Sequence, residues 1–485
     1  MNSVKKNFLY SVAYQMLVLI VPLITTPYIS RVIGAEGVGI YTYTYSIVYY
    51  FTLIAMMGIN NYGNRTIAKV RDNKEKMADT FISIYTLQFI MSVIMIFIYL
   101  IYVLFLTNEY RWMHTIQMIY MISVIFDINW LYFGLEKFKI TVTRNVIIKV
   151  ISTIFIFIFV KERTDLWKYT VIMATSTLIT QLYLWTILKK NVNINKENIQ
   201  KNYKNALKHL KPTLILFIPV IAVSLYKIMD KIMLGQLSSM TEVGLYENSE
   251  KIVNIPLGLI NALGTIMLPR MSNIIANGKK EEMHQYINKS IEFVMFLSCA
   301  IAFGIMTIGP EFAPLFFGEE FMESGKLISY LAVTTIFISW ANVIRTQYLI
   351  PMEKDKIYIC SVIFGAIFNF NFNMILIPRF NALGAVISTI LAEFTVMAMQ
   401  TIAVRKELPI KKYILKSIKF IISAIIMYVV LFTLEKMLKN IISGWTLIIF
   451  EVILGIIIYC ILNIKYIKKT LNYKRWSKIW KRKEI

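Results

Sequence analysis

Three charged residues interrupt the apolar stretch 213–236: Lys227, Asp230 and Lys231. If this stretch is helical, Lys227 and Lys231 share one face, and Asp230 is a near neighbour of Lys227. Charge inside a membrane-spanning helix is costly, so it marks a binding site or a transport path by default. Two lysines on one face would attract an anion such as a phosphate group. The alternative is structural: Lys227 pairs with Asp230, and Lys231 extends its ammonium group to the membrane surface.

Three arginines near the ends of other apolar stretches extend this cationic set. Arg31 ends the first stretch, where an anchor at the membrane interface is the plainer role. Arg270 and Arg345 lie near the ends of later stretches, where basic residues also orient a membrane protein. We predict a cationic central cavity that binds an anionic substrate, with these candidate contacts: Arg31, Lys227, Lys231, Arg270 and Arg345.

Tyrosines open the apolar stretch 39–59. Tyr41, Tyr45 and Tyr49 follow one another at intervals of four and share a helical face, which Tyr43 does not. Aromatic faces with hydroxyl groups can pack against sugars and exchange hydrogen bonds with them. For Tyr41 and Tyr43, an aromatic belt at the membrane interface is the simpler role. Tyr45 is therefore our candidate substrate contact.

Two acids lie deepest in their apolar stretches, Asp127 and Glu393. Together with Asp230 they are candidates for carrying a coupling ion, or for ion pairs with a buried Lys or Arg. The three cysteines and three histidines lie far apart without metal-ligand spacing, so we expect no metal site. We also expect no catalytic residues.

The elements that position these residues follow from composition and hydropathy. Apolar residues form 57% of the 485 residues, above the usual share in soluble domains, and the mean hydropathy is +0.60. The excess must face lipid, where one helical span needs about 20 apolar residues. Fourteen candidate transmembrane helices follow: 8–30, 39–59, 79–106, 113–134, 146–160, 167–188, 213–236, 252–275, 290–309, 327–349, 357–378, 383–404, 414–434 and 443–464.

The distribution of basic residues sets the orientation. The chain carries 52 Lys and Arg against 28 Asp and Glu, a formal net charge of +24. With the N-terminus inside, 40 of these 52 lie in or beside the inner segments and 10 lie on the outer side. This is the positive-inside pattern of membrane proteins. It predicts a multi-pass membrane protein with both termini cytoplasmic, and it removes the reason to expect a nucleic-acid partner.

Two sequence anchors recur in matching loops. One has a glycine followed by EGVGIY at 34–41, and a glycine followed by EVGLY at 235–246. The other reads LEKFKI at 135–140 and MEKDKI at 352–357. Six predicted helices separate the copies of each anchor, so the halves are parallel repeats with one orientation. The predicted organisation is an N-lobe 1–188, a cytoplasmic linker 189–212, a C-lobe 213–404, two further helices in 405–464 and a basic tail 465–485.

The tail 465–485 carries nine basic residues and apolar residues that fall roughly on one helical face. We predict that it lies on the inner leaflet, held by anionic lipid. A disordered basic tail is the alternative.

Several ordered motifs carry a family resemblance: residues 34–41, 130–144, 230–246, 317–321 and 378–393. On these the chain resembles the Wzx-type oligosaccharide flippases of the multidrug/oligosaccharidyl-lipid/polysaccharide exporter superfamily. The resemblance implies an all-α, MATE-like architecture of two six-helix lobes plus two C-terminal helices. It implies flipping of undecaprenyl-diphosphate-linked repeat units to the outer leaflet by alternating access, for surface polysaccharide synthesis. It also implies membrane lipids, a polysaccharide polymerase and chain-length proteins as partners, and proton or sodium coupling without a cofactor.

Three other functions stay open at this stage. A cation-coupled multidrug exporter shares the fold, and so does a lipid II flippase. Flippases of peptidoglycan precursors use basic residues of their second helix, and residues 39–59 contain none. A membrane-embedded glycosyltransferase or polymerase would need a large outer loop, whereas the predicted outer loops here are short.

Overall fold

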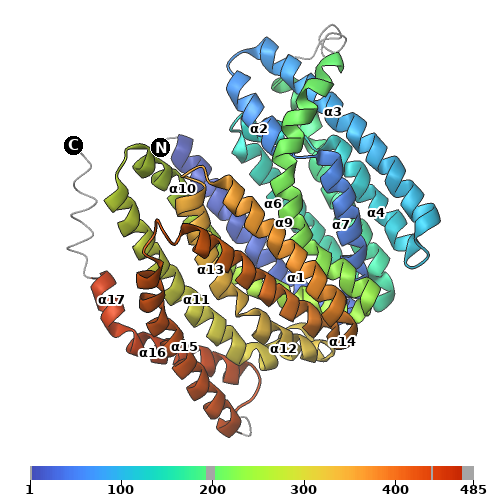
Figure 1. Cartoon of the computed structure of the whole chain (residues 1–485). Helices are drawn as coiled ribbons and strands as arrows, with labels where there is room; N and C mark the ends of the chain where they lie inside the picture. Colours follow the sequence, from blue (N-terminus) through green and yellow to red (C-terminus); the bar gives the residue numbers. More distant parts are fainter. Residues whose placement is uncertain (1–2, 193–202, 439–440, 472–485) are drawn as a thin grey trace. The chain divides into compact units, whose positions relative to one another are not determined.

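The computed structural model describes residues 3–192, 203–438 and 441–471, and over this range the chain is helical without β-strands (Figure 1). The predicted all-α fold class is therefore confirmed. The α-helices are α1 (Ser3–Met56), α2 (Ile59–Val70), α3 (Lys74–Ile101), α4 (Arg111–Ser123), α5 (Asn129–Gly134), α6 (Phe138–Phe159), α7 (Leu166–Thr186), α9 (Leu210–Leu237), α10 (Met240–Ala276), α11 (Lys280–Phe317), α12 (Met322–Leu331), α13 (Thr334–Ile344), α14 (Asp355–Val404), α15 (Ile410–Leu438), α16 (Trp445–Leu462) and α17 (Ile464–Leu471). Short 3-10 or π-helical turns are η1 (Tyr102–Leu106), η2 (Val124–Phe126), η3 (Arg163–Asp165), η4 (Leu188–Lys190), η5 (Tyr203–His209), η6 (Glu319–Phe321) and η7 (Arg345–Leu349).

Two of the long helices each contain two predicted spans. In α1 the break is at Gly34, with φ 72° and ψ 177°, and in α14 it is at Asn381, with φ 53° and ψ −134°. Positive φ is open to glycine without penalty and is tolerated by asparagine better than by most residues. The two breaks fall between the predicted spans 8–30 and 39–59, and between 357–378 and 383–404.

Ten helices of the described part are long and apolar enough to cross a membrane. An eleventh span is counted if Glu319–Leu331 and Thr334–Leu349, which meet at a bend of 42°, act as one. The 50-residue helix α14 counts once here although its break divides it into two predicted spans. The observed elements are thus consistent with the predicted helix count.

Several helices extend beyond the predicted spans at their polar ends. Helix α6 begins at Phe138, before the predicted span 146–160, and includes the buried Arg144. Helices α10 and α11 extend beyond the spans 252–275 and 290–309. The segment 310–326, which separates the predicted spans 290–309 and 327–349, is largely helical. Hydropathy locates only the part of a helix that lies in lipid. The same helix can continue for further polar turns beyond that part, which hydropathy does not detect.

The chain divides into two compact units. Unit 1 comprises Met1–Glu247 and Asn373–Ala382, and unit 2 comprises Asn248–Phe372 and Leu383–Ile485. The middle of α14 therefore belongs with unit 1 and its two ends with unit 2. The lobe boundaries derived from the sequence remain predictions.

The second sequence anchor forms the same turn in both copies. Glu136 and Glu353 both have left-handed backbone, with φ of 56° and 55°. The Lys137 amide donates to the carbonyl five residues earlier at 2.9 Å, and the Lys354 amide does the same at 2.8 Å. This bond is the helix-ending pattern in which a left-handed residue closes the last turn. The predicted repeat is therefore visible in the backbone.

In unit 2 the turn at Glu353 is held by hydrogen bonds to Glu407, a residue that follows the end of α14. The Lys354 ammonium donates to the Glu407 carboxylate at 2.6 Å, and the Tyr348 hydroxyl donates to the same carboxylate. The hydrogen bond from Lys354, followed by that from Tyr348, holds the pKa of Glu407 below its usual value. This carboxylate therefore stabilises the folded state in its ionised form.

The first sequence anchor brings two glycines into close contact within unit 1. A Cβ on Gly39 would lie 1.6 Å from the Met240 carbonyl oxygen, and a Cβ on Gly244 would lie 2.0 Å from the Ala35 carbonyl oxygen. The contacts are reciprocal: Met240 lies four residues before Gly244, and Ala35 lies four residues before Gly39. Only glycine permits this approach of α1 to α10.

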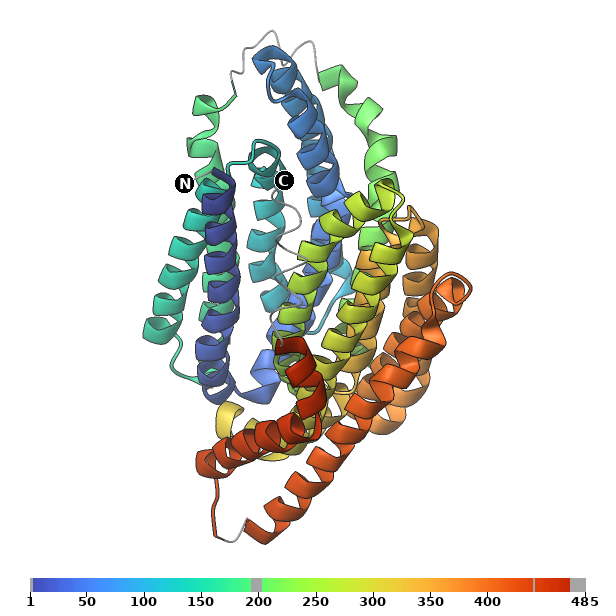
Figure 2. The same cartoon turned by 90° about the vertical axis from the view of Figure 1, so that its left-hand side faces the viewer.

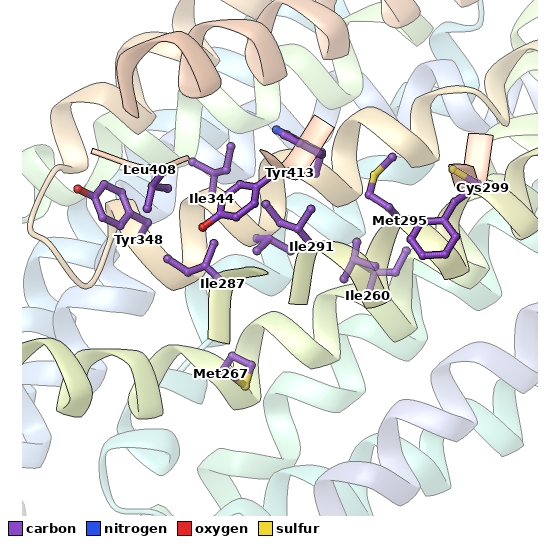
Figure 3. Close-up of a cluster of buried hydrophobic side chains, with 14 of the residues drawn as sticks. Ile260, Met267, Ile287, Ile291, Met295, Cys299, Ile344, Tyr348, Leu408 and Tyr413 are labelled. Carbon is purple, nitrogen blue, oxygen red and sulfur yellow. The ribbon is translucent and has the colours of Figure 1, made fainter. Parts of the chain in front are cut away.

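The buried core cluster of unit 2 is made mainly by α10, α11, α13, η7 and the stretch of α15 from Ile410 to Leu431; Figure 3 draws part of it. Ile260 and Met267 of α10 face Ile287, Ile291 and Met295 of α11 in this cluster. Outside the core, α15 and α16 present large apolar side chains at the surface, for example Ile422, Ile453 and Ile457, between 48% and 55% exposed. Such surfaces are stable only against lipid.

Candidate functional site

Five tyrosines from three helices of unit 1 meet in one place, and we call them the tyrosine cluster. Tyr41, Tyr45 and Tyr49 come from the second half of α1, Tyr120 from α4 and Tyr169 from α7. The interval of four residues places the first three on one face, as predicted from the sequence. All five are partly buried and partly accessible.

The rings of the tyrosine cluster form a continuous aromatic surface. Tyr41 and Tyr45 stack with centroids 5.9 Å apart and planes 13° apart. Tyr169 meets Tyr41 at 4.8 Å, and Tyr120 meets Tyr45 at 5.1 Å. The hydroxyls of Tyr45 and Tyr120 share a hydrogen bond of 3.2 Å. Aromatic faces edged with hydroxyl groups suit a ligand that has both C–H faces and many hydroxyls.

A charged pair lies beside the tyrosine cluster. Lys231 of α9 forms a salt bridge of 2.6 Å with Glu247 of α10, and their side chains are 15% and 14% exposed. Both groups are close enough to the Tyr45 hydroxyl to interact with it electrostatically. Lys231 is thus drawn to Glu247 and does not extend to the membrane surface as the structural alternative required. The pair offers one cation and one anion to a polar ligand.

Asp230 is buried next to this pair and is held by two neutral donors. The Tyr246 hydroxyl donates to its carboxylate at 2.8 Å, and the Asn373 amide donates at 2.6 Å. Asp230 is 2% exposed and Asn373 is fully buried. Lys227 is exposed and makes no ion pair within the described residues. The alternative Lys227–Asp230 pair is therefore replaced by bonds to Tyr246 and Asn373.

The other predicted cationic residues lie elsewhere. Arg31 of α1 is exposed, close to the break at Gly34. In unit 2, the Arg270 guanidinium lies 4.3 Å from the Tyr286 ring centroid and donates to its hydroxyl. Arg345 begins the π-helical turn η7, with its guanidinium 5.4 Å from the ring centroid of Tyr358.

The two remaining acids differ in their surroundings. Glu393 of α14 is 7% exposed and makes no hydrogen bond or ion pair with any residue of the described ranges. The Asp127 carboxylate accepts bonds from the backbone and side chain of Asn129, at 3.1 and 2.7 Å. The Arg144 guanidinium donates to the Asn129 side-chain oxygen at 2.9 Å. Asp127 is therefore linked to a buried arginine through one amide.

The bonds around Asp127 stabilise a break between α4 and α5. Gln88 of α3 donates to the carbonyls of Val124 and Asp127 at 2.9 and 2.8 Å, and Trp130 donates to the Gln88 oxygen at 2.9 Å. These carbonyls lie where the helix is interrupted, so they need donors from side chains. The backbone carbonyl of Asp127 therefore has a structural role.

Sequence reasoning found part of the site and missed part. It identified Tyr45, Lys231 and Asp230, which the structure brings together. It missed Glu247, although this acid follows directly after the repeated motif at 242–246. It also missed Tyr120 and Tyr169, because no local pattern links two single tyrosines in separate helices to the tyrosines of α1.

Two family models match the chain. A model described as polysaccharide biosynthesis protein matches residues 4–275, and a model described as MatE matches residues 216–375. A protein of Shigella dysenteriae named as an O-antigen transporter is 25% identical over 409 residues, which is 83% of this chain and 100% of the relative.

Solved structures share the fold. A lipid II flippase MurJ in an inward closed conformation has a TM-score of 0.75 at 12% identity, covering 96% of this chain and 99% of that one. An inward-facing multidrug transporter of the MATE family has a TM-score of 0.56 at 13% identity, covering 81% and 99%. The predicted MATE-like fold is thus confirmed.

Proposed function

Because this chain belongs to the polysaccharide biosynthesis protein family, we propose that it flips a lipid-linked oligosaccharide across the cytoplasmic membrane. The carrier lipid would be undecaprenyl diphosphate, and the glycan a repeat unit of a surface polysaccharide. The relative named as an O-antigen transporter matches over its whole length. That name and those of the structural neighbours describe transporters and not enzymes. The chain is accordingly a membrane transporter.

The tyrosine cluster is the observation that carries this proposal. Its stacked rings and paired hydroxyls lie beside the Lys231–Glu247 salt bridge. A glycan presents C–H faces to aromatic rings and hydroxyls to both charged groups. An apolar drug would gain from the rings but would form no hydrogen bonds with the tyrosine hydroxyls or the charged groups. The composition of the site therefore favours a sugar.

The diphosphate of the substrate needs cationic partners to offset its loss of water. In this proposal the Lys231 ammonium turns from Glu247 to the diphosphate when the substrate enters. Arg31, Lys227, Arg270 and Arg345 are the further proposed contacts. Together they would supply the cationic path of an alternating-access cycle.

Glu393 is the proposed coupling acid. It is buried in a span and has no hydrogen-bond donor or cation among the described residues. An acid inside a membrane span without such partners is a functional candidate, whereas Asp230 is held by Tyr246 and Asn373. Glu393→Gln should abolish the dependence of transport on a proton gradient, and an unchanged dependence would exclude Glu393.

Conditional depletion of the protein tests the proposed substrate. Mass spectrometry of the polyprenyl lipids should show accumulation of complete repeat units on undecaprenyl diphosphate, inaccessible from outside the cell. Re-expression of the natural chain should clear them, whereas Tyr45→Ala should not. If the lipids do not accumulate and the surface polysaccharide remains intact, the proposal is wrong.

The MatE match over residues 216–375 supports one second candidate, a cation-coupled multidrug exporter. This activity predicts lower resistance to cationic drugs after depletion and unchanged polyprenyl lipids. The same depletion experiment therefore separates the two functions.

A further inference from the structure

A basic patch lies where α15 and α17 meet in unit 2. It consists of Lys419 of α15 and Lys465, Lys468 and Lys469 of α17, all exposed. Within the described residues none of the four forms an ion pair. The proposed transport cycle does not use this patch.

The short helix α17 is held in a defined position by one aromatic residue. The Tyr466 ring lies 5.1 Å from the Phe296 ring of α11 and 5.0 Å from the Phe420 ring of α15. Nearby, the Tyr459 hydroxyl of α16 donates to the Phe296 carbonyl at 2.9 Å. Tyr466 packs against these two rings, whereas Lys465, Lys468 and Lys469 of the same helix are exposed. Figure 2 shows α17 following α16 at a bend.

Lys419 is fixed at the junction of the two helices. Its ammonium lies 4.5 Å from the Phe420 ring centroid and 5.1 Å from that of Tyr466. The neighbouring Lys416 is already neutralised, since it pairs with Glu292 and donates to Asn288 at 2.9 Å. Lys419 lies within electrostatic range of Glu292, whose charge Lys416 already balances, and of Lys469 and Lys416. Lys419 and Lys469 therefore repel one another, and an anion would relieve the repulsion.

Apolar side chains of α15, α16 and α17 flank the patch. Ile414, Leu415 and Ile418 of α15 are 45%, 70% and 40% exposed. Ile461 of α16 and Ile464 of α17 are 61% and 45% exposed. A ligand for this place needs an anionic group for the lysines and hydrocarbon for the isoleucines. Phospholipids with a net negative charge combine the two.

We propose that this basic patch is a binding site for the headgroup of an anionic phospholipid in the inner leaflet. Lys419 and Lys469 contact the headgroup phosphate, Lys465 and Lys468 add to the local positive potential, and the acyl chains lie along α15. The site anchors the C-terminal end of the chain to the membrane surface. It is independent of the proposed transport function, since it needs no glycan substrate.

Native mass spectrometry of the purified full-length chain tests the site. The protein is titrated with phosphatidylglycerol, with phosphatidylcholine and with inorganic phosphate. We expect tight binding of phosphatidylglycerol only. Lys419→Gln combined with Lys469→Gln should weaken it roughly 30-fold, which corresponds to about 1 kcal/mol for each lysine at an anionic surface.

Two matched variants make the result specific. Lys204→Gln with Lys208→Gln removes the same charge from exposed lysines near the start of α9 and should leave binding unchanged. Lys419→Arg with Lys469→Arg should retain it. Equal affinity for both lipids, equal loss in the two glutamine double variants, or equally tight binding of inorganic phosphate would each overturn the proposal. Because no glycan lipid is present, failure here leaves the proposed function untouched.

Discussion

Substitution of Tyr45 tests whether the tyrosine cluster contacts the transported glycan. The Tyr45 ring lies against Tyr41, Tyr49 and Tyr120, and its hydroxyl bonds that of Tyr120. A hydrogen bond contributes about 1 kcal/mol, and an aromatic contact contributes a similar amount. Tyr45→Phe loses the hydroxyl, so we expect transport to slow about fivefold. Tyr45→Ala loses the ring as well, and we expect a loss of about 30-fold.

The assay is the rate at which lipid-linked oligosaccharide becomes accessible outside membrane vesicles, normalised to the folded transporter. Tyr85 of α3 is the matched control, because its ring also meets three others, those of Phe81, Phe89 and Trp185. Tyr85→Ala should destabilise the protein to a similar extent without slowing each folded molecule. If Tyr45→Ala and Tyr85→Ala reduce the normalised rate equally, the cluster does not contact the glycan.

Three further substitutions test the fold and its ion pairs. Gly39→Ala would place a Cβ against a backbone oxygen and should prevent folding. Gly304→Ala is the control, because a Cβ there has no neighbouring atom within 4 Å. It should raise the free energy of unfolding by up to about 1 kcal/mol, measured by thermal unfolding. Lys231→Gln removes the cation of a largely buried salt bridge and should cost about 3 kcal/mol, of which Glu247→Gln in the same chain should recover most; no recovery would contradict the pairing. Glu407→Gln removes stabilisation that exists above about pH 4.3 and disappears as the pH falls through the lowered pKa of this residue. The melting temperatures of natural and variant chains should therefore differ at neutral pH and converge in acid.

The fold could be predicted from the sequence because lipid imposes a simple rule. Every span must be apolar over its length, so hydropathy alone locates most helices. The rule does not say where helices end or break. The break at Asp127 depends on Gln88 of α3, which donates to the Asp127 carbonyl and accepts a hydrogen bond from Trp130 of α5. When a side chain of one helix satisfies the free carbonyls of another, the single sequence carries no periodic pattern that reveals it.

The candidate site was predictable only where its residues share one helix. Spacing placed Tyr41, Tyr45 and Tyr49 on one face, because a helix repeats every 3.6 residues. Spacing could not show which of Lys227 and Lys231 belongs to the site, since both occupy one helical face. Only packing shows that Lys231 is the less exposed of the two. The partner of Lys231 lies on another helix and was therefore missed.

Reconstitution provides the most direct test of the proposed function. The purified chain is placed in vesicles that contain the host's undecaprenyl-diphosphate-linked repeat unit in both leaflets, and a glycosidase is added outside. The account predicts that nearly all of the lipid is cleaved when the transporter is present, and about half in protein-free vesicles or with Tyr45→Ala over the same time. If the natural chain leaves half of the lipid protected, it does not flip this substrate.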